Sequence, residues 1–178
     1  MNTPIILGVD PGKEGALAAL DAATGAPVAR PRQSSAIGQS RQWALAGAQI
    51  AAISLFDVNT AGCEALAQRL KDNYPQIDVR TSSNDPAGHD LVVNATPMGM
   101  NEGDPLPMDV SRLSPETFVG EVVMKAETTA FLAAAQARGC RTQVGTDMLY
   151  EQIPAYLEYF GLPTTTAEVL RSGAKLSY

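Results

Sequence analysis

The stretch that decides the fold is Leu91–Met100, which reads LVVNATPMGM. Its first three residues are apolar and predict a short buried strand, and Pro97 and Gly99 predict a tight turn beyond it. Between them, Asn94 and Thr96 offer an amide and a hydroxyl group. In an open α/β sheet, ligands bind at the carboxyl ends of the strands. The segment therefore predicts a ligand site, with an ordinary strand exit as the alternative.

The rest of the chain alternates short apolar runs with segments of helical periodicity. Helices are expected over residues 61–71, over residues 127–138 and from residue 145 to Phe160. Strands are expected near Ile53, Val79, Leu91, Val122 and Thr142. Short strands that alternate with helices of about 10–15 residues indicate βαβ units. The predicted fold class is therefore α/β, a three-layer sandwich with a mainly parallel sheet.

Three segments carry a resemblance to a known family: residues 53–60 (ISLFDVNT), 94–100 (NATPMGM) and 145–152 (GTDMLYEQ). In this order they resemble the C-terminal, nucleotide-binding domain of the shikimate dehydrogenase family, which includes the quinate/shikimate dehydrogenases. The resemblance extends over roughly residues 44–170. It implies a Rossmann-like fold and an NAD(P)-dependent oxidoreductase of aromatic amino acid biosynthesis. Such an enzyme transfers a hydride between the nicotinamide cofactor and a ring alcohol of shikimate or quinate.

A dinucleotide-binding fold opens with a strand, a glycine-rich turn and a helix whose N-terminus receives the pyrophosphate. Counting back from an expected helix at residues 39–47 places this turn on residues 33–38 (QSSAIG). Gly38 matches one glycine of G-x-G-x-x-G, whereas the other two positions fall on Gln33 and Ser35. Side chains there oppose close approach of the phosphates. The strand before this turn, Val28–Arg32, contains a proline, which a central strand disfavours.

Asp57 follows the expected strand near Ile53. A carboxylate at this place accepts hydrogen bonds from the adenosine ribose and repels a 2′-phosphate. Asn59 and Thr60 follow without an arginine to hold that phosphate. NAD is therefore favoured over NADP. The alternative is that Asp57 caps the helix that is expected to start near Thr60.

The family resemblance adds further residues to the candidate site at the carboxyl ends of the strands. The expected cofactor-binding residues are Gly38, Asp57, Asn59, Thr60, Asn94, Thr96, Met98, Gly145 and Met148. By resemblance, Gly145 and Met148 face the nicotinamide and Gln152 binds the hydroxyls of the substrate acid, although Met148 also suits the packed face of a helix. The catalytic Lys and Asp of the family belong to an N-terminal substrate domain that this sequence does not match. No catalytic residue is therefore assigned, no metal site is expected, and we expect the chain alone to be impaired or inactive.

The N-terminal residues show a different resemblance. Residues 5–21 (IILGVDPGKEGALAALD) predict an atypical β-hairpin, similar to the opening hairpin of ribonuclease-H-like Holliday-junction resolvases. In those enzymes the Asp matched by Asp10 binds catalytic magnesium. We expect an N-terminal hairpin segment over residues 1–32 and the Rossmann-like domain over residues 33–178. The N-terminal segment could be a natural fusion, a degenerate segment or the result of a frame error. Two alternative functions are open. The broken glycine turn favours a nonenzymatic remnant or interaction module, and Asp10 would serve a metal-dependent nuclease.

Composition narrows the classes of partner. The net charge is −6 and the 13 basic residues are scattered, which opposes a nucleic-acid surface. Apolar runs are too short for a membrane span, and the first residues lack the pattern of a signal peptide, so a cytoplasmic protein is expected. Cys63 and Cys140 are expected to be buried thiols, and His89 a loop residue rather than a base. The expected ligand is a small molecule of the shikimate or quinate type. The chain is also expected to form a homo-oligomer or to bind a partner that supplies the missing substrate domain.

Overall fold

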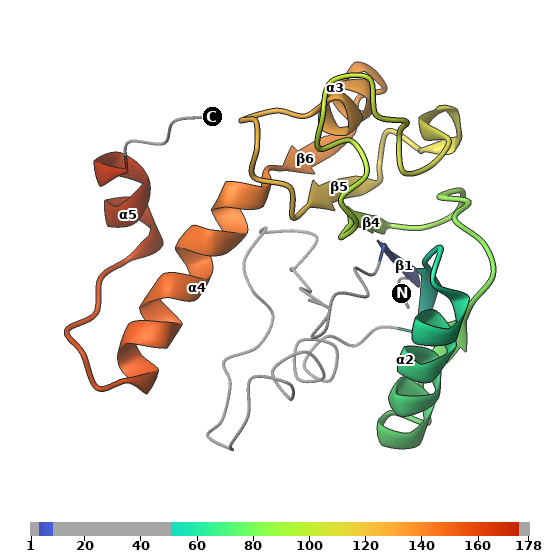
Figure 1. Ribbon diagram of the computed structural model, residues 1–178, viewed down its shortest axis with the longest axis horizontal. Helices are drawn as coiled ribbons and strands as arrows, with labels where there is room; N and C mark the ends of the chain where they lie inside the picture. Colours follow the sequence, from blue (N-terminus) through green and yellow to red (C-terminus); the bar gives the residue numbers. More distant parts are fainter. Residues whose placement is uncertain (1–3, 9–50, 175–178) are drawn as a thin grey trace.

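The computed structural model describes residues 4–8 and 51–174, and of residues 4–8 and of Met148 it describes the backbone only. These residues form a six-stranded sheet in the order β3-β2-β1-β4-β5-β6, in which all neighbouring strands are parallel (Figure 1). The strands are β1 (Pro4–Gly8), β2 (Ala52–Phe56), β3 (Asp78–Arg80), β4 (Leu91–Asn94), β5 (Phe118–Glu121) and β6 (Arg141–Gln143). The parallel α/β fold predicted from the sequence is thus confirmed.

Within residues 51–174, four α-helices and a short 3-10 helix connect and flank the strands. They are α2 (Thr60–Asn73), η1 (Val110–Arg112), α3 (Ala130–Ala137), α4 (Gly145–Tyr159) and α5 (Ala167–Gly173). The helices α2, α3 and α5 each begin at a side chain that accepts a hydrogen bond from an N–H of the first turn. These caps are Asn59, Thr129 and Thr166. Each cap satisfies a backbone donor that has no partner within the helix, which sets where the helix starts.

Alternate residues of the central strands face two helical layers. On β4, Leu91 and Val93 belong to the apolar cluster under α2, whereas Val92 belongs to the cluster under α3. This is the period of two of a strand whose two faces are both covered. The helices complete the two clusters with Cys63, Ala67 and Leu70 from α2 and with Phe131, Leu132 and Ala135 from α3. The three predicted layers are therefore present, with α2 and α3 on opposite faces of the sheet.

The centre of the sheet departs from the sequence prediction. β1 pairs with β2 on one side and with β4 on the other, which is the place of the first strand in a dinucleotide-binding fold. Pro4–Gly8 therefore stands where the sequence favoured Val28–Arg32. β1 is also the expected first strand of the predicted N-terminal hairpin. The second half of that hairpin, Val28–Arg32 and the expected boundary between residues 32 and 33 lie outside the described residues.

The loop from Met98 to Ser114 is anchored in its second half. Met108 and Leu113 are buried in the cluster under α3. The guanidinium of Arg112 donates to both carboxylate oxygens of Asp85, at 2.6 and 2.7 Å. Burial and this ion pair fix the second half of the loop, so only its first half is free of these anchors.

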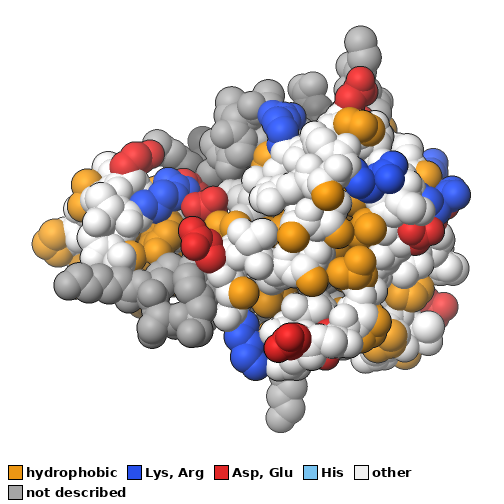
Figure 2. Space-filling view, turned by 90° about the horizontal axis from the view of Figure 1, so that it is seen from above, with side chains coloured by type: hydrophobic (Ala, Val, Ile, Leu, Met, Phe, Trp, Pro, Cys, Tyr) orange, Lys and Arg blue, Asp and Glu red, His pale blue; other side chains and the backbone are white. Residues whose placement is uncertain are grey.

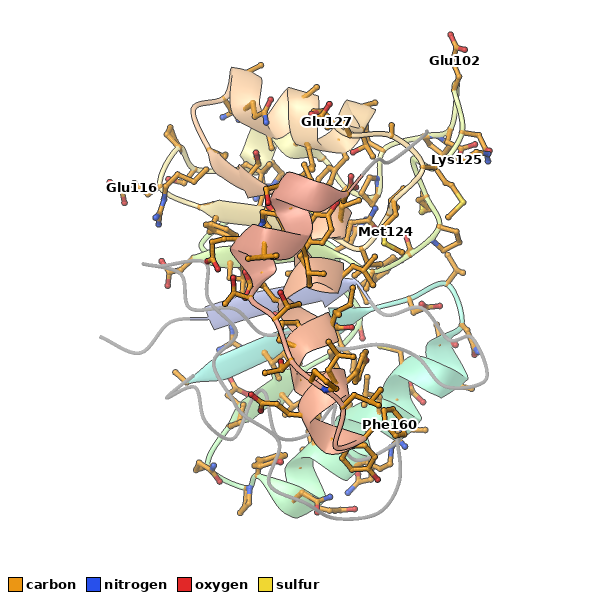
Figure 3. The ribbon with its side chains drawn as sticks, turned by 90° about the vertical axis from the view of Figure 1, so that its left-hand side faces the viewer. Glu102, Glu116, Met124, Lys125, Glu127 and Phe160 are labelled. Carbon is orange, nitrogen blue, oxygen red and sulfur yellow. The ribbon has the colours of Figure 1, made fainter. Side chains whose placement is uncertain are left out.

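α4 leaves the sheet after β6 and packs against α5 (Figure 1). Arg171 of α5 joins the two helices, because its guanidinium contacts Asp147 at 2.9 Å and Glu151 at 2.7 Å. The far end of α4 leads to Phe160, whose side chain is 70% exposed (Figure 3). In the part of the chain that the structure describes, no helix combines the length and the apolar character needed to cross a bilayer.

The start of α4 gives a test of the fold. A β-carbon at Gly145 would lie 2.3 Å from the Val123 carbonyl oxygen. We expect Gly145→Ala to lower the free energy of unfolding by about 1–3 kcal/mol, because backbone must move to admit the methyl group. Gly173→Ala is the matched control, since nothing lies within 4 Å of a β-carbon there, and it should leave stability unchanged or slightly higher. Urea denaturation measures both variants. Equal unfolding free energies for the two variants would show that the backbone at Val123 moves aside without loss of stability.

Candidate functional site

Polar residues gather at one edge of the sheet because all its strands run in the same direction. Asp57 follows β2, Asn94 ends β4, Glu121 ends β5, and Gly145 follows β6 within two residues. In the order of the strands, these positions form a row along the carboxyl edge. The four strand spacings from β2 to β6 span about 19 Å, since neighbouring strands lie about 4.8 Å apart. The edge is therefore wide enough for an extended ligand, and it lies where open α/β sheets bind ligands.

At the β2 end, Asp57 and Asn59 have separate tasks. Asp57 is 5% exposed, and its Oδ1 accepts a hydrogen bond from the backbone N–H of Asn59 at 2.6 Å. Asn59 Oδ1 in turn accepts from the N–H of Gly62 at 3.0 Å and so caps α2. The interpretation of Asp57 as the helix cap is therefore wrong, because Asn59 fills that position. Thr60 is the first residue of α2 and is exposed.

At the β4 end, Asn94 organises the turn that follows it. Its Oδ1 accepts from the N–H of Thr96 at 3.1 Å and from the Thr96 hydroxyl at 2.7 Å. Its Nδ2 donates to the Met98 carbonyl at 3.0 Å, and the Met98 N–H donates back to Thr96 Oγ1 at 3.2 Å. Asn94 itself is fully buried. We call Asn94–Met98 the β4 turn; the polar groups that the sequence assigned to a ligand hold the shape of this turn.

At the β5 end, the structure adds two residues that the sequence analysis missed. Glu121 is 5% exposed, and Thr129, the cap of α3, donates its hydroxyl hydrogen to Glu121 Oε1. Glu121 Oε2 is buried and has no hydrogen-bond partner among the described residues. A single acidic residue inside an apolar run, Phe118–Val123 (FVGEVV), is the sequence signal that could have found it.

Burial raises the pKa of Glu121, while hydrogen bonds from Thr129 and, to a smaller extent, Asn94 act against this shift. Desolvation disfavours the charged form of a carboxyl group, and no charged side chain of the described residues contributes to the shift. The neutral form is thus favoured relative to an exposed glutamate.

At the β6 end, α4 starts directly beside the backbone of β5's exit. Val144 precedes the helix and makes no side-chain cap hydrogen bond. Among the described residues, α4 therefore begins without the side-chain cap that α2, α3 and α5 have. Gln152 lies on this helix, and its Oε1 accepts from the Tyr156 hydroxyl at 3.2 Å. The backbone of Met148 is part of the same helix. Gly145, Met148 and Gln152 therefore share one element, as the resemblance implied.

Other residues that the sequence singled out lie either outside the described residues or elsewhere in the fold. Gly38 and Asp10 lie outside the described residues. His89 precedes β4 at the opposite edge, where its ring contacts Ser54 Oγ at 3.0 Å and the Ala87 carbonyl at 3.0 Å. Those two contacts give His89 a structural role, in line with its expected place in a loop.

Metal-ligating side-chain types, thiols and surface charge also bear on the chemistry of the described residues. No group of three or more His, Cys, Asp or Glu side chains there could hold a metal ion. Cys63 and Cys140 are both buried and unpaired with each other, as expected, and burial raises the pKa of each thiol. On the face seen in Figure 2, Lys and Arg side chains are scattered among acidic and apolar ones and form no continuous basic surface.

The raised pKa of Glu121 predicts how stability depends on pH. A carboxyl group whose pKa is raised by folding stabilises the fold fully below its unfolded pKa of about 4.3, and that contribution is lost as the pH rises through the folded pKa. Glu121→Gln remains neutral at every pH. We therefore expect its unfolding free energy, relative to wild type, to increase with pH in urea titrations. The exposed Glu116→Gln is the control and should show no such trend. A relative stability that falls with pH would mean that the fold stabilises ionised Glu121.

The comparisons with known proteins agree with this geometry. No family model matches the sequence. The chain is 33% identical over 132 residues to a quinate/shikimate dehydrogenase (NAD(+)) from Corynebacterium glutamicum, a match that covers 71% of this chain and 47% of that enzyme. It is also 33% identical over 175 residues to a shikimate dehydrogenase (NADP(+)) from Methylocella silvestris, which covers 93% of this chain and 61% of that enzyme.

A solved structure gives the same answer. Quinate dehydrogenase from Corynebacterium glutamicum, determined in complex with NAD, superposes with a TM-score of 0.63 and 29% sequence identity. The superposition covers 79% of this chain and 51% of that one. The chain thus spans about half the length of the relatives that it matches. It belongs to the shikimate dehydrogenase family, and it matches that family's C-terminal, NAD(P)-binding domain.

Proposed function

We propose that the chain is a shikimate dehydrogenase-like oxidoreductase domain that binds a nicotinamide dinucleotide along the carboxyl edge of its sheet. The observation that carries this proposal is the row formed by Asp57, the β4 turn and Gly145. In it, the adenosine lies near Asp57, the middle of the cofactor along the β4 turn, and the nicotinamide near Gly145 and Met148. Gln152, further along α4, binds the hydroxyls of a shikimate- or quinate-type acid.

The proposed cofactor is NAD rather than NADP. Asp57 has used Oδ1 to accept from Asn59, which holds the carboxylate at the edge and leaves Oδ2 for a ribose hydroxyl. A negative charge at this point repels the 2′-phosphate of NADP. Relatives named for NAD and for NADP both match the chain, so the preference depends on this local charge.

Asp57→Asn is the sharpest test of the preference. The amide keeps an oxygen for Asn59 and removes the charge. We expect NAD binding to weaken by about tenfold, through loss of a charge-assisted hydrogen bond worth about 1.5 kcal/mol, and NADP binding to weaken less or to improve. Calorimetric titration with both cofactors measures the ratio. Asp90→Asn, an exposed aspartate at the opposite edge, is the control. An unchanged NAD/NADP ratio would reduce Asp57 to a turn residue, and no NAD binding by wild type at millimolar concentration would favour the nonenzymatic alternative.

Turnover requires more than this edge. The catalytic Lys and Asp of the family are not assigned among the residues that the structure describes. We propose that another polypeptide supplies the substrate-binding half. The end of α4 supports a partner, because Tyr156, Tyr159 and Phe160 are 55, 65 and 70% exposed. Clustered aromatic side chains of this kind are enriched at protein interfaces.

Oxidation of shikimate or quinate with NAD, followed by absorbance of the reduced cofactor, tests this division of roles. We expect the isolated chain to bind NAD with negligible turnover, because the groups that move the proton are not assigned in it. An intact quinate/shikimate dehydrogenase is the positive control. Robust turnover by the isolated chain would contradict the proposal that it depends on a second polypeptide.

A further inference from the structure

The proposed function does not use the buried carboxyl group of Glu121. Glu121 is 5% exposed, and its Oε2 is enclosed without a hydrogen-bond partner among the described residues. Burying a polar group costs free energy unless that group is bonded, so a half-satisfied carboxyl group at the end of a central strand requires an explanation. Its other oxygen provides one, because Oε1 accepts from Thr129 at the start of α3.

Glu121 also lies directly beside the β4 turn. Asn94 and Glu121 are register partners on the parallel strands β4 and β5. Their neighbours Val92 and Val119 pack under α3. Because side chains alternate along a strand, Asn94 and Glu121 project from this same face of the sheet. Glu121 therefore bonds to the cap of α3 and lies in register with the residue that organises the β4 turn.

We propose that Glu121 is a positioning residue, which holds the β4 turn in its binding shape by linking Asn94 to the N-terminus of α3. The link is a chain of contacts. The Leu132 N–H donates to the Thr129 hydroxyl at 3.3 Å, and that hydroxyl donates to Glu121. Asn94 is the register partner of Glu121 on β4 and bonds to Thr96 and Met98. Buried bonds in series support one another, so removing the central member loosens both ends.

Four variants separate this role from general packing. Glu121→Leu and Thr129→Val keep the approximate shape and remove the link. Glu121→Gln and Thr129→Ser keep an acceptor and a hydroxyl, so they should preserve it. The readout is amide hydrogen exchange at Thr96 and Met98, whose N–H groups bond to side chains within the β4 turn. The Gly62 amide is the internal control, because it bonds to a side chain at the β2 end, away from Glu121.

We expect exchange at Thr96 and Met98 to become about tenfold faster in Glu121→Leu and Thr129→Val, through local opening of the turn, with Gly62 unchanged. Exchange in Glu121→Gln and Thr129→Ser should match wild type. Equal acceleration at Gly62 would show a general loss of stability, and unchanged exchange at Thr96 and Met98 would show that the turn stands alone. Either result overturns the proposal.

The expected effect on NAD affinity rests on the proposed function. The experiments distinguish failure of that function from failure of the role proposed for Glu121. Calorimetry should show NAD binding weakened by about tenfold in Glu121→Leu and kept within about twofold in Glu121→Gln, since a loosened site costs ordering on binding. If wild type does not bind NAD, the proposed function fails, while the exchange data still decide the role of Glu121. Faster exchange with unchanged NAD affinity would overturn the claim that Glu121 prepares the turn for binding.

Discussion

Parallel pairing of all six strands is the constraint on which the rest of this structure depends. Parallel neighbours need crossover connections, and α2 and α3 supply two of them, one on each face of the sheet. Burial on both faces follows, and it extends to the polar residues Asn94 and Glu121 at the ends of β4 and β5. Partners within the protein then bond to Asn94 and to one of the two carboxylate oxygens of Glu121. The β4 turn and the Thr129 cap are the partners that the fold provides, so the same constraint that gathers the site residues also fixes their surroundings.

Much of the fold could be predicted from local patterns. The structure confirms the strands that were predicted from the run LVV before Asn94 and the run ISLF before Asp57. It also confirms the positions of the helices that were predicted from amphipathic segments. Boundaries were less accessible. The strand expected near Val122 ends at Glu121, and the helix expected from residue 127 begins at Ala130, because Thr129 turns its side chain to cap it.

What the sequence could not provide were contacts between distant segments. The place of β1 depends on pairing with β2 and β4, whereas its local sequence also suits a hairpin. Glycines at positions 8, 12 and 15 directly after an apolar run were the available signal for a first strand. Glu121 was missed for a related reason. It bonds to Thr129 and lies in register with Asn94, and no periodic pattern in the sequence indicates either relationship. Asp57 and Asn59 were both recognised, but only the geometry divides the turn and the helix cap between them.

Gly145 and Pro154 together give α4 an uneven stiffness along its length. The backbone of its first residue is pressed against Val123, so this end is fixed to the sheet. Pro154 lies inside the helix and lacks the N–H that would bond to the preceding turn. Helices bend where such a bond is missing. Displacement of the aromatic end of α4 is therefore expected to bend the helix at Pro154 and to leave its start, beside the proposed nicotinamide position, in place. Pro154 thus lies between the edge proposed for the cofactor and the aromatic end proposed for a partner.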